Sequence, residues 1–296
     1  MTLALAWSAQ QRAPLPQVKA PCAPNAAAIA ASAVDCLLLE VETWPKPGLV
    51  SHVDRGSHED MDAETLRVSA ETIGPYFAAL AEAGAGGCAM EQLRIIGLEA
   101  EAAMFAATSG INTHRGAIFG LGLLCAAAGA RSNGQVDPAL SLGATVTCLW
   151  GSSILGGPVL LHSHGMKARR RFGAGGARVE AAKGFPSVYH VGLPALHRGA
   201  LVAADDAEAA RVEACFALIA AVEDTNLLHR GGLDGLLFAR RVARQFLGQG
   251  GVGAPDWRER ARAIHDSFIV RRLSPGGSAD LLAMTLFVDA HERSCR

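Results

Sequence analysis

The 296-residue chain is half hydrophobic and 5% aromatic, which provides enough apolar material for a sizeable core. With 27 Lys and Arg against 28 Asp and Glu, its formal net charge is −1, so no global basic field draws it to nucleic acid or to an anionic membrane. None of the seven cysteines belongs to a Cys-x-x-Cys pair, which predicts free thiols in a reducing cytoplasm.

Alanine and leucine dominate and no long alternating pattern is present, so the sequence predicts an all-α fold. We expect a single multi-helix globular domain over residues 24–296, with long functional loops. Residues 1–23 are predicted to be a flexible extension, because no basic region precedes their short apolar start. Helices are expected over residues 25–42, 62–83, 88–108, 115–130, 138–153, 208–222, 233–247, 255–272 and 278–293.

Local signals mark some of these helices. Asn25 and Asp62 are suited to cap the first two, and Pro75 should kink or split the second. The helices over 115–130 and 138–153 are apolar nearly all round, so they should lie centrally. The helix over 138–153 belongs to an uncharged stretch that is about as long as a membrane span. Because Gly and Pro interrupt this stretch, a buried helix followed by a turn is favoured over a membrane span.

Six polar runs separate the apolar stretches, and each contains proline or glycine. Proline fixes φ and glycine frees it, so such runs can hold an unusual backbone shape around a ligand. Six of them in one domain suggest one large site for a large, charged ligand. They cover residues 44–50, 54–61, 110–116, 173–186, 224–232 and 273–280.

Acidic side chains recur in these loops, above all Asp54, Asp60, Asp224 and Asp280. Carboxylates held in this way can bind Mg²⁺, usually together with substrate phosphates, or can act as a general base. The alternative interpretation is that they cap helices or lie in solvated turns, and the pattern alone leaves both open.

Basic side chains are also spread over the loops. Lys46 lies between two prolines, and Arg115 follows Asn-Thr-His at a predicted helix start, where the helix N-terminus favours an anion. Together with Arg178 and Arg230, they would suit a triphosphate if they converge. Ser278 can cap the last helix, whose free N–H groups either bind an anion or are simply capped.

Histidines are frequent in the same loops, including His58 and His114. There is no His-Glu-x-x-His motif and no tight Cys/His set, so hydrogen-bonding or acid roles are favoured over zinc binding.

Six runs in order resemble the triphosphoribosyl-dephospho-CoA synthase family, which serves citrate lyase and malonate decarboxylase. The similarity spans about residues 35–285, and the Gly- and Ala-rich character favours the malonate decarboxylase branch. Arg115 stands where the family commonly has Lys, and Ser57 where it has Ala. The matching runs are 45–50, 56–61, 112–119, 176–181, 224–227 and 273–283.

The resemblance implies a helical cytoplasmic enzyme that takes ATP and 3′-dephospho-CoA. It implies release of adenine and transfer of the triphosphoribosyl group to the 2′-hydroxyl of the dephospho-CoA ribose. The product would pass to a transferase that acts on an acyl carrier subunit. Mg²⁺ is expected, and a homodimer would be compatible with so apolar a helical chain.

This chemistry needs a group that holds the triphosphate, one that assists the leaving adenine and one that deprotonates the hydroxyl. We predict Asp224 as the general base, Asn226 as the residue that orients it or the sugar, and His58 or His114 as the partner of adenine. Nucleotide and Mg²⁺ binding are assigned to Lys46, Arg115, Arg178, Arg230, Ser278, Asp54, Asp60 and Asp280. Two alternatives remain: an Mg²⁺-dependent hydrolase of nucleotide N-glycosides, and a non-catalytic helical assembly factor.

Overall fold

The computed structural model describes residues 25–158 and 175–293. These residues form α-helices, a short π-helix and a 3₁₀ turn, without a strand, which confirms the all-α prediction. The helices are α1 (Ala26–Val41), α2 (Ala63–Ala85), α3 (Met90–Ala107), α4 (Arg115–Ser132), α5 (Leu142–Gly156), α7 (Gly176–Ala182), η1 (Val188–Gly192), α8 (Leu193–Val202), α9 (Ala207–Ala221), α10 (Thr225–Gly248), η2 (Gly251–Gly253), α11 (Trp257–Val270) and α12 (Gly276–Arg293).

The first two helices begin at the predicted caps. The Asn25 side chain accepts a hydrogen bond from the Ala28 N–H at 2.8 Å, and Asp62 forms a reciprocal capping box with Thr65. α2 continues through Pro75 without a break, so the predicted split is wrong. Buried residues on both sides of the proline pack in the core, and this packing offsets the hydrogen bond that proline cannot donate.

α4 lies at the centre, as predicted, because it is buried nearly all round. α2 and α4 approach each other backbone to backbone: a Cβ on Gly84 would overlap the Ala126 backbone, and one on Gly129 would overlap the Ala81 backbone. Small residues at these positions thus allow the two helix backbones to lie closer together than larger side chains would permit. The five cysteines within the described ranges are free, as expected.

Several helix boundaries differ from the sequence prediction. α5 begins after Ser141, whose side chain caps it, rather than at residue 138. α10 begins at Thr225, so the run over 224–232 is helical and not an open loop, apart from a positive φ at Gly232. The sequence analysis also missed α7, η1 and α8.

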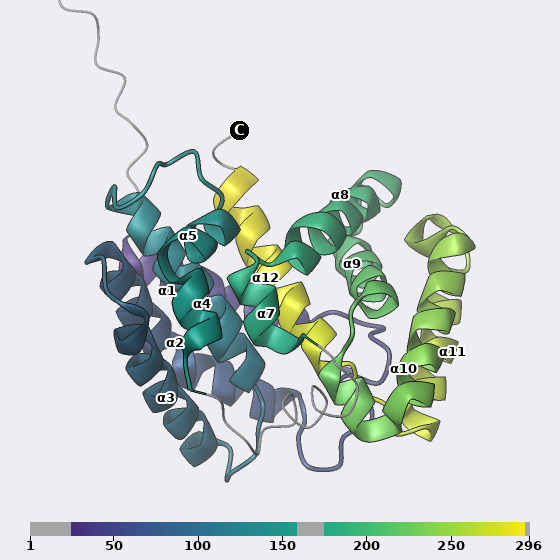
Figure 1. Ribbon diagram of the computed structural model, residues 1–296. Coiled ribbons are helices and arrows are strands. Elements are labelled where there is room, and N and C mark those ends of the chain that lie inside the picture. The colour runs from purple at the N-terminus through teal and green to yellow at the C-terminus, as the bar shows by residue number, and fades with distance from the viewer. Residues whose placement is uncertain (1–24, 159–174, 294–296) are drawn as a thin grey trace, which may run out of the picture.

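α12 crosses the middle of the molecule, between one group of helices that contains α1 to α5 and another that contains α8 to α11 (Figure 1). It packs against members of both groups, including α1, α4 and α9. No helix within residues 25–158 and 175–293 is long and apolar enough to span a membrane. The predicted extension over 1–23 lies outside the described residues.

Candidate functional site

A cavity of about 1000 Å³ lies where the two groups of helices meet α12. Each of the six polar runs found in the sequence contributes to its wall, so the structure brings all six together at one cavity, as predicted. One lining residue from each run, in chain order, is Val50, His58, His114, Glu180, Asn226 and Asp280.

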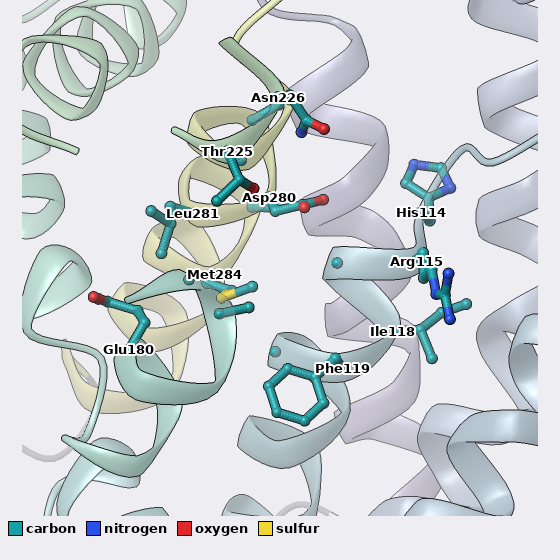
Figure 2. A pocket seen from close by; sticks show the side chains of 18 of the residues that line it. His114, Arg115, Ile118, Phe119, Glu180, Thr225, Asn226, Asp280, Leu281 and Met284 are labelled. Atoms are coloured by element: carbon teal, nitrogen blue, oxygen red, sulfur yellow. The ribbon is translucent and has the colours of Figure 1, made fainter. Parts of the chain in front are cut away.

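Three long helices begin at the polar end of this cavity. The first residues of α4, α10 and α12 all belong to its wall. Figure 2 shows Thr225, Asn226 and Asp280 on one side of the space and His114 and Arg115 on the other. Helix N-termini present free N–H groups and a partial positive charge, so this end of the cavity is suited to phosphate groups.

Asp224 caps two helices at once. Its Oδ1 accepts hydrogen bonds from the N–H groups of Asn226 (2.9 Å) and Leu227 (3.2 Å), at the start of α10. Its Oδ2 accepts from the N–H (2.8 Å) and the hydroxyl (3.0 Å) of Ser278 in α12. Burial raises the pKa of this carboxyl, and the four hydrogen bonds oppose the rise. With its oxygens engaged in this way, Asp224 fits a positioning role and not the predicted role of general base.

The same contacts revise the position of Ser278. α12 begins two residues before it, so Ser278 lies inside the first turn rather than at the cap. Its N–H and its hydroxyl both donate to Asp224 and are not directed to a phosphate. The anion-binding role predicted for Ser278 therefore does not fit its contacts.

The Asp224→Asn substitution tests the double cap. An amide can still cap α10 through its oxygen, but its NH₂ group would face the Ser278 N–H, which then loses the carboxylate acceptor and keeps only the Pro275 carbonyl at 2.9 Å. We expect a loss of about 1–3 kcal/mol in the free energy of unfolding, measured by urea denaturation. Unchanged stability together with lost turnover would contradict the positioning role and restore the general base.

Asp280 points toward the N-terminus of α4, across from its own helix. The Ala117 N–H donates to its carboxylate, and a Cβ on Gly116 would overlap that carboxylate, so glycine is needed at this position. Burial, followed by repulsion from Asp224 and Glu40, raises the pKa of Asp280 well above its usual range. A cavity-lining carboxylate with a raised pKa takes up a proton more readily than an ordinary one, which is what a general base requires.

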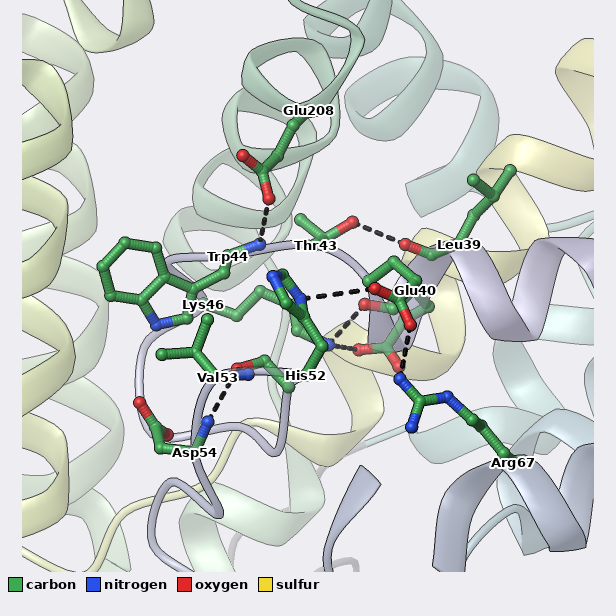
Figure 3. A network of polar contacts seen from close by, with 12 residues as sticks. Leu39, Glu40, Thr43, Trp44, Lys46, His52, Val53, Asp54, Arg67 and Glu208 are labelled. Carbon is green, nitrogen blue, oxygen red and sulfur yellow. Dashed lines mark hydrogen bonds and ion pairs between the residues drawn. The ribbon is translucent and has the colours of Figure 1, made fainter. Parts of the chain in front are cut away.

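Lys46 lies behind the cavity and does not line it. It is fully buried, and its Nζ is 2.5 Å from both the carboxylate Oε1 and the backbone oxygen of Glu40 (Figure 3). The predicted contact with a phosphate therefore does not fit this position. The prolines around Lys46 present it inward, to a buried carboxylate.

Asp54 is also outside the cavity wall. Its Oδ1 accepts a hydrogen bond from the Gly56 N–H at 2.8 Å, and it lies 3.1 Å from Nε2 of the buried His265. Since His265 also contacts the Lys46 carbonyl at 2.6 Å, this carboxylate fixes the 44–61 loop on α11. Its predicted role as a metal ligand is not supported by these contacts.

Two of the predicted arginines, Arg178 and Arg115, differ in their surroundings. Arg178 lines the cavity, but its guanidinium donates to carbonyls at the end of α5, including those of Leu155 and Gly157 at 3.0 Å. It therefore caps α5, as cations at helix C-termini do, and the predicted phosphate contact does not fit. Arg115 pairs with Glu101 at 2.9 Å, is about one-third exposed, and lies at the start of α4 beside the cavity.

A polar cluster beside α10 and the start of α12 joins three of the predicted residues. His58 lies 2.9 Å from the Ser274 hydroxyl through Nε2 and 3.3 Å from Asp60 through Nδ1. Arg230 contacts the same imidazole and donates to the Ser57 carbonyl at 3.1 Å. Burial, and then the Arg230 charge, lower the pKa of His58, so this histidine is neutral at neutral pH.

His114 is buried between α2 and the start of α4, and it lines the cavity. Its Nδ1 lies 2.8 Å from the Ser69 hydroxyl. Burial, and then the nearby Lys46 charge, lower the pKa of His114 to about 4. A neutral imidazole of this kind can hydrogen-bond to a substrate, but it holds no readily transferred proton at pH 7.

The predicted Mg²⁺ ligands do not form a protein cage. Within the described ranges, no group of three or more His, Cys, Asp or Glu side chains could hold a metal ion. Asp60 is exposed beside His58, whereas Asp280 is buried against α4. Because Mg²⁺ in nucleotide sites keeps waters and substrate phosphates as ligands, one cavity carboxylate such as Asp60 would fit a nucleotide-borne ion.

Glu101, a cavity residue within a helix, was not predicted from the sequence. It pairs with Arg115 from the α3 face that also carries Leu93 and Gly97. A carboxylate on an otherwise apolar helix face was the available signal. Glu40, on α1, was among the acidic residues noted near the loops, and it lines the cavity and pairs with Lys46.

The chain is similar to known proteins over most of its length. Residues 26–295 match the family described as ATP:dephospho-CoA triphosphoribosyl transferase. A protein of Stutzerimonas stutzeri is 39% identical over 276 residues (90% of this chain and 93% of the relative), and one of Azotobacter vinelandii is 40% identical (88% and 90%). Both are named probable 2-(5″-triphosphoribosyl)-3′-dephosphocoenzyme-A synthase. No solved structure matches. The chain therefore belongs to the ATP:dephospho-CoA triphosphoribosyl transferase family.

Proposed function

We propose that this transferase moves the triphosphoribosyl group of ATP to the 2′-hydroxyl of 3′-dephospho-CoA and releases adenine. The product would be 2′-(5″-triphosphoribosyl)-3′-dephospho-CoA. The observation that carries the proposal is the meeting of six polar runs at one cavity, in a chain whose relatives are named for this synthesis. At this cavity, three helix N-termini lie beside a carboxyl of raised pKa.

The triphosphate would bind at the polar end. The starts of α4, α10 and α12 lie there, with some of their N–H groups already bound by Asp224 and Asp280, and Arg115 and Arg230 add positive charge at the wall. Asp60 would hold an Mg²⁺ ion that ATP brings with it, and this ion would neutralise phosphate charge. The protein's own residues then have to place the ribose between the acceptor and the leaving base.

Transfer breaks the bond between the ribose C1′ and adenine N9 and forms a bond from C1′ to the acceptor 2′-oxygen. In our assignment Asp280 accepts the hydroxyl proton, because its raised pKa suits a base near neutrality. Asn226, on the same side of the cavity, would hydrogen-bond to a sugar hydroxyl (Figure 2). A neutral His58 would hydrogen-bond to adenine as negative charge develops, and solvent would supply the proton that adenine takes up.

A single displacement of this kind inverts the configuration at C1′ and forms no covalent enzyme intermediate. By analogy with inverting glycoside hydrolysis, the base and the partner of the leaving group should lie on opposite faces of the sugar. Asp280 on α12 and His58 in the 54–61 loop both line the cavity, and His58 lies beside Ser274 just before α12, so a sugar would have to bind between the two side chains to meet this requirement.

The pathway assignment is part of the proposal. The Gly- and Ala-rich composition favours the malonate decarboxylase branch over citrate lyase, with the product passed to a transferase that acts on an acyl carrier subunit in the cytoplasm. Because the product is the same molecule in both branches, the choice is tested in cells: loss of this protein should leave the malonate decarboxylase carrier without its prosthetic group. Loss of the group from the citrate lyase carrier alone would contradict it.

Adenine release is the first measurement. Purified protein with Mg²⁺ and ATP should release adenine only when 3′-dephospho-CoA is present, with a joined product of the expected mass. Adenine without an acceptor would instead identify a nucleotide N-glycoside hydrolase. No adenine under either condition would favour the non-catalytic assembly factor.

A further inference from the structure

A branch of the cavity that is lined mainly by apolar side chains runs along α3 and α4, away from the polar end, with Arg94 of α3 as a charged residue in its wall. The Glu101–Arg115 ion pair marks its start. From there the lining follows α3 back to Met90 and α4 forward to Leu123. At 1.5 Å per helical residue these paths are about 16 Å and about 12 Å long. We call this branch the apolar channel, and its wall includes Met90, Leu93, Gly97, Phe119, Leu123 and Ile154.

Gly97 is unusual among the glycines that line the cavity. A Cβ on Gly116 or Gly120 would overlap Asp280 or Met284, so packing explains those two. A Cβ on Gly97 would meet nothing within 4 Å, and its φ is an ordinary helical one. Glycine in the middle of a helix weakens it relative to alanine. Neither packing nor backbone geometry therefore requires this glycine, whereas open space in the channel does depend on it.

The chemistry of the proposed substrates indicates what would enter the channel. Their phosphates and riboses are polar and match the helix N-termini and arginines at the other end. The adenine of ATP has to leave. The acceptor carries one further part, a pantetheine arm that is long, uncharged and partly aliphatic. A long channel with apolar walls matches that arm better than it matches any charged group.

We propose that the apolar channel binds the pantetheine arm of 3′-dephospho-CoA and that Gly97 sets the width that admits the arm. This inference rests on the proposed function, since it names the place of one part of that acceptor. Gly97 is then a specificity-determining residue and takes no part in the chemical step.

Replacing Gly97 with leucine tests the proposal. The Cβ of the added side chain would meet none of the described residues within 4 Å, so the fold should tolerate the substitution. We expect the KM for 3′-dephospho-CoA to rise at least about tenfold, as when a pocket is mismatched by a methylene group or more. The KM for ATP should stay unchanged, and Gly97→Ala should behave nearly like the unaltered protein.

Gly248→Leu is the matched control. Gly248 is also helical, a Cβ there also meets nothing within 4 Å, and it is absent from the cavity wall. Its kinetics should match those of the unaltered protein. A Gly97→Leu variant that raises the KM for ATP alone, or neither KM, would overturn the proposal.

A binding measurement separates failure of this inference from failure of the proposed function. ADP has the nucleotide part of 3′-dephospho-CoA but lacks the arm. In thermal-shift titrations the unaltered protein should bind 3′-dephospho-CoA more tightly than ADP, and Gly97→Leu should remove most of this preference. Equal binding of the two ligands by the unaltered protein would refute the arm site, whatever the adenine assay shows. If no adenine is released but the unaltered protein clearly prefers 3′-dephospho-CoA to ADP, only the transfer reaction is refuted.

Discussion

The Asp280→Asn variant is expected to lose about 100- to 10,000-fold in kcat while it still binds ATP, because an amide cannot take up the hydroxyl proton. Asparagine keeps the shape and the oxygen that accepts from Ala117 beside Gly116, so the start of α4 should remain intact. Adenine release at saturating ATP and 3′-dephospho-CoA measures kcat, and titration with ATP measures binding.

The pH dependence follows from the same assignment. Burial and the neighbouring carboxylates raise the pKa of Asp280, and a base works only when it is deprotonated. The kcat of the unaltered protein should therefore rise with pH through this raised pKa, and the residual activity of Asp280→Asn should lack that rise. Asp60→Asn separates the two carboxylate roles: it should raise the KM for Mg²⁺–ATP and keep the rise of kcat with pH, since Asp60 is assigned to the metal ion and not to the proton. Loss of the pH-dependent rise in Asp60→Asn would contradict the assignment of the base.

The location of the site could be predicted from the sequence because proline and glycine mark it locally. All six polar runs reach the cavity, including 44–50, which does so through Leu49 and Val50. Helix caps such as Asn25 and Asp62 were predictable for the same reason, since their partners lie three residues away. Interactions between residues so close in sequence can be predicted without knowledge of the tertiary fold.

The roles within the site were not predictable, because they depend on distant partners. Asp224 meets Ser278 across 54 residues, and this contact makes it a double cap rather than a free base. Arg178 meets the end of α5, 21 to 24 residues before it in the chain. The start of α12 was misplaced for a related reason: glycines at 276 and 277 usually indicate a loop, yet here they begin a helix next to Asp224.

The ion pair of Lys46 and Glu40 shows how burial decides a role that the sequence leaves open. Prolines on both sides of a lysine indicated a fixed cation, which is correct, but they did not indicate its direction. In the fold this cation is fully buried against the Glu40 carboxylate, and its charge helps to lower the pKa of His114. Lys46 thus affects the protonation of a cavity residue, His114, although it does not line the cavity itself.

Lys46→Met should destabilise the protein by about 3–5 kcal/mol, because it leaves the Glu40 carboxylate buried without its partner. Urea denaturation would measure this loss. Adding Glu40→Gln to Lys46→Met should recover part of it, since the orphaned charge is then removed. Lys183→Met is the matched control: Lys183 is an exposed lysine on the same chain, and its loss should change stability little. If Lys46→Met instead raised the KM for ATP at unchanged stability, the lysine would contact phosphate after all, and the buried pair would not be its function.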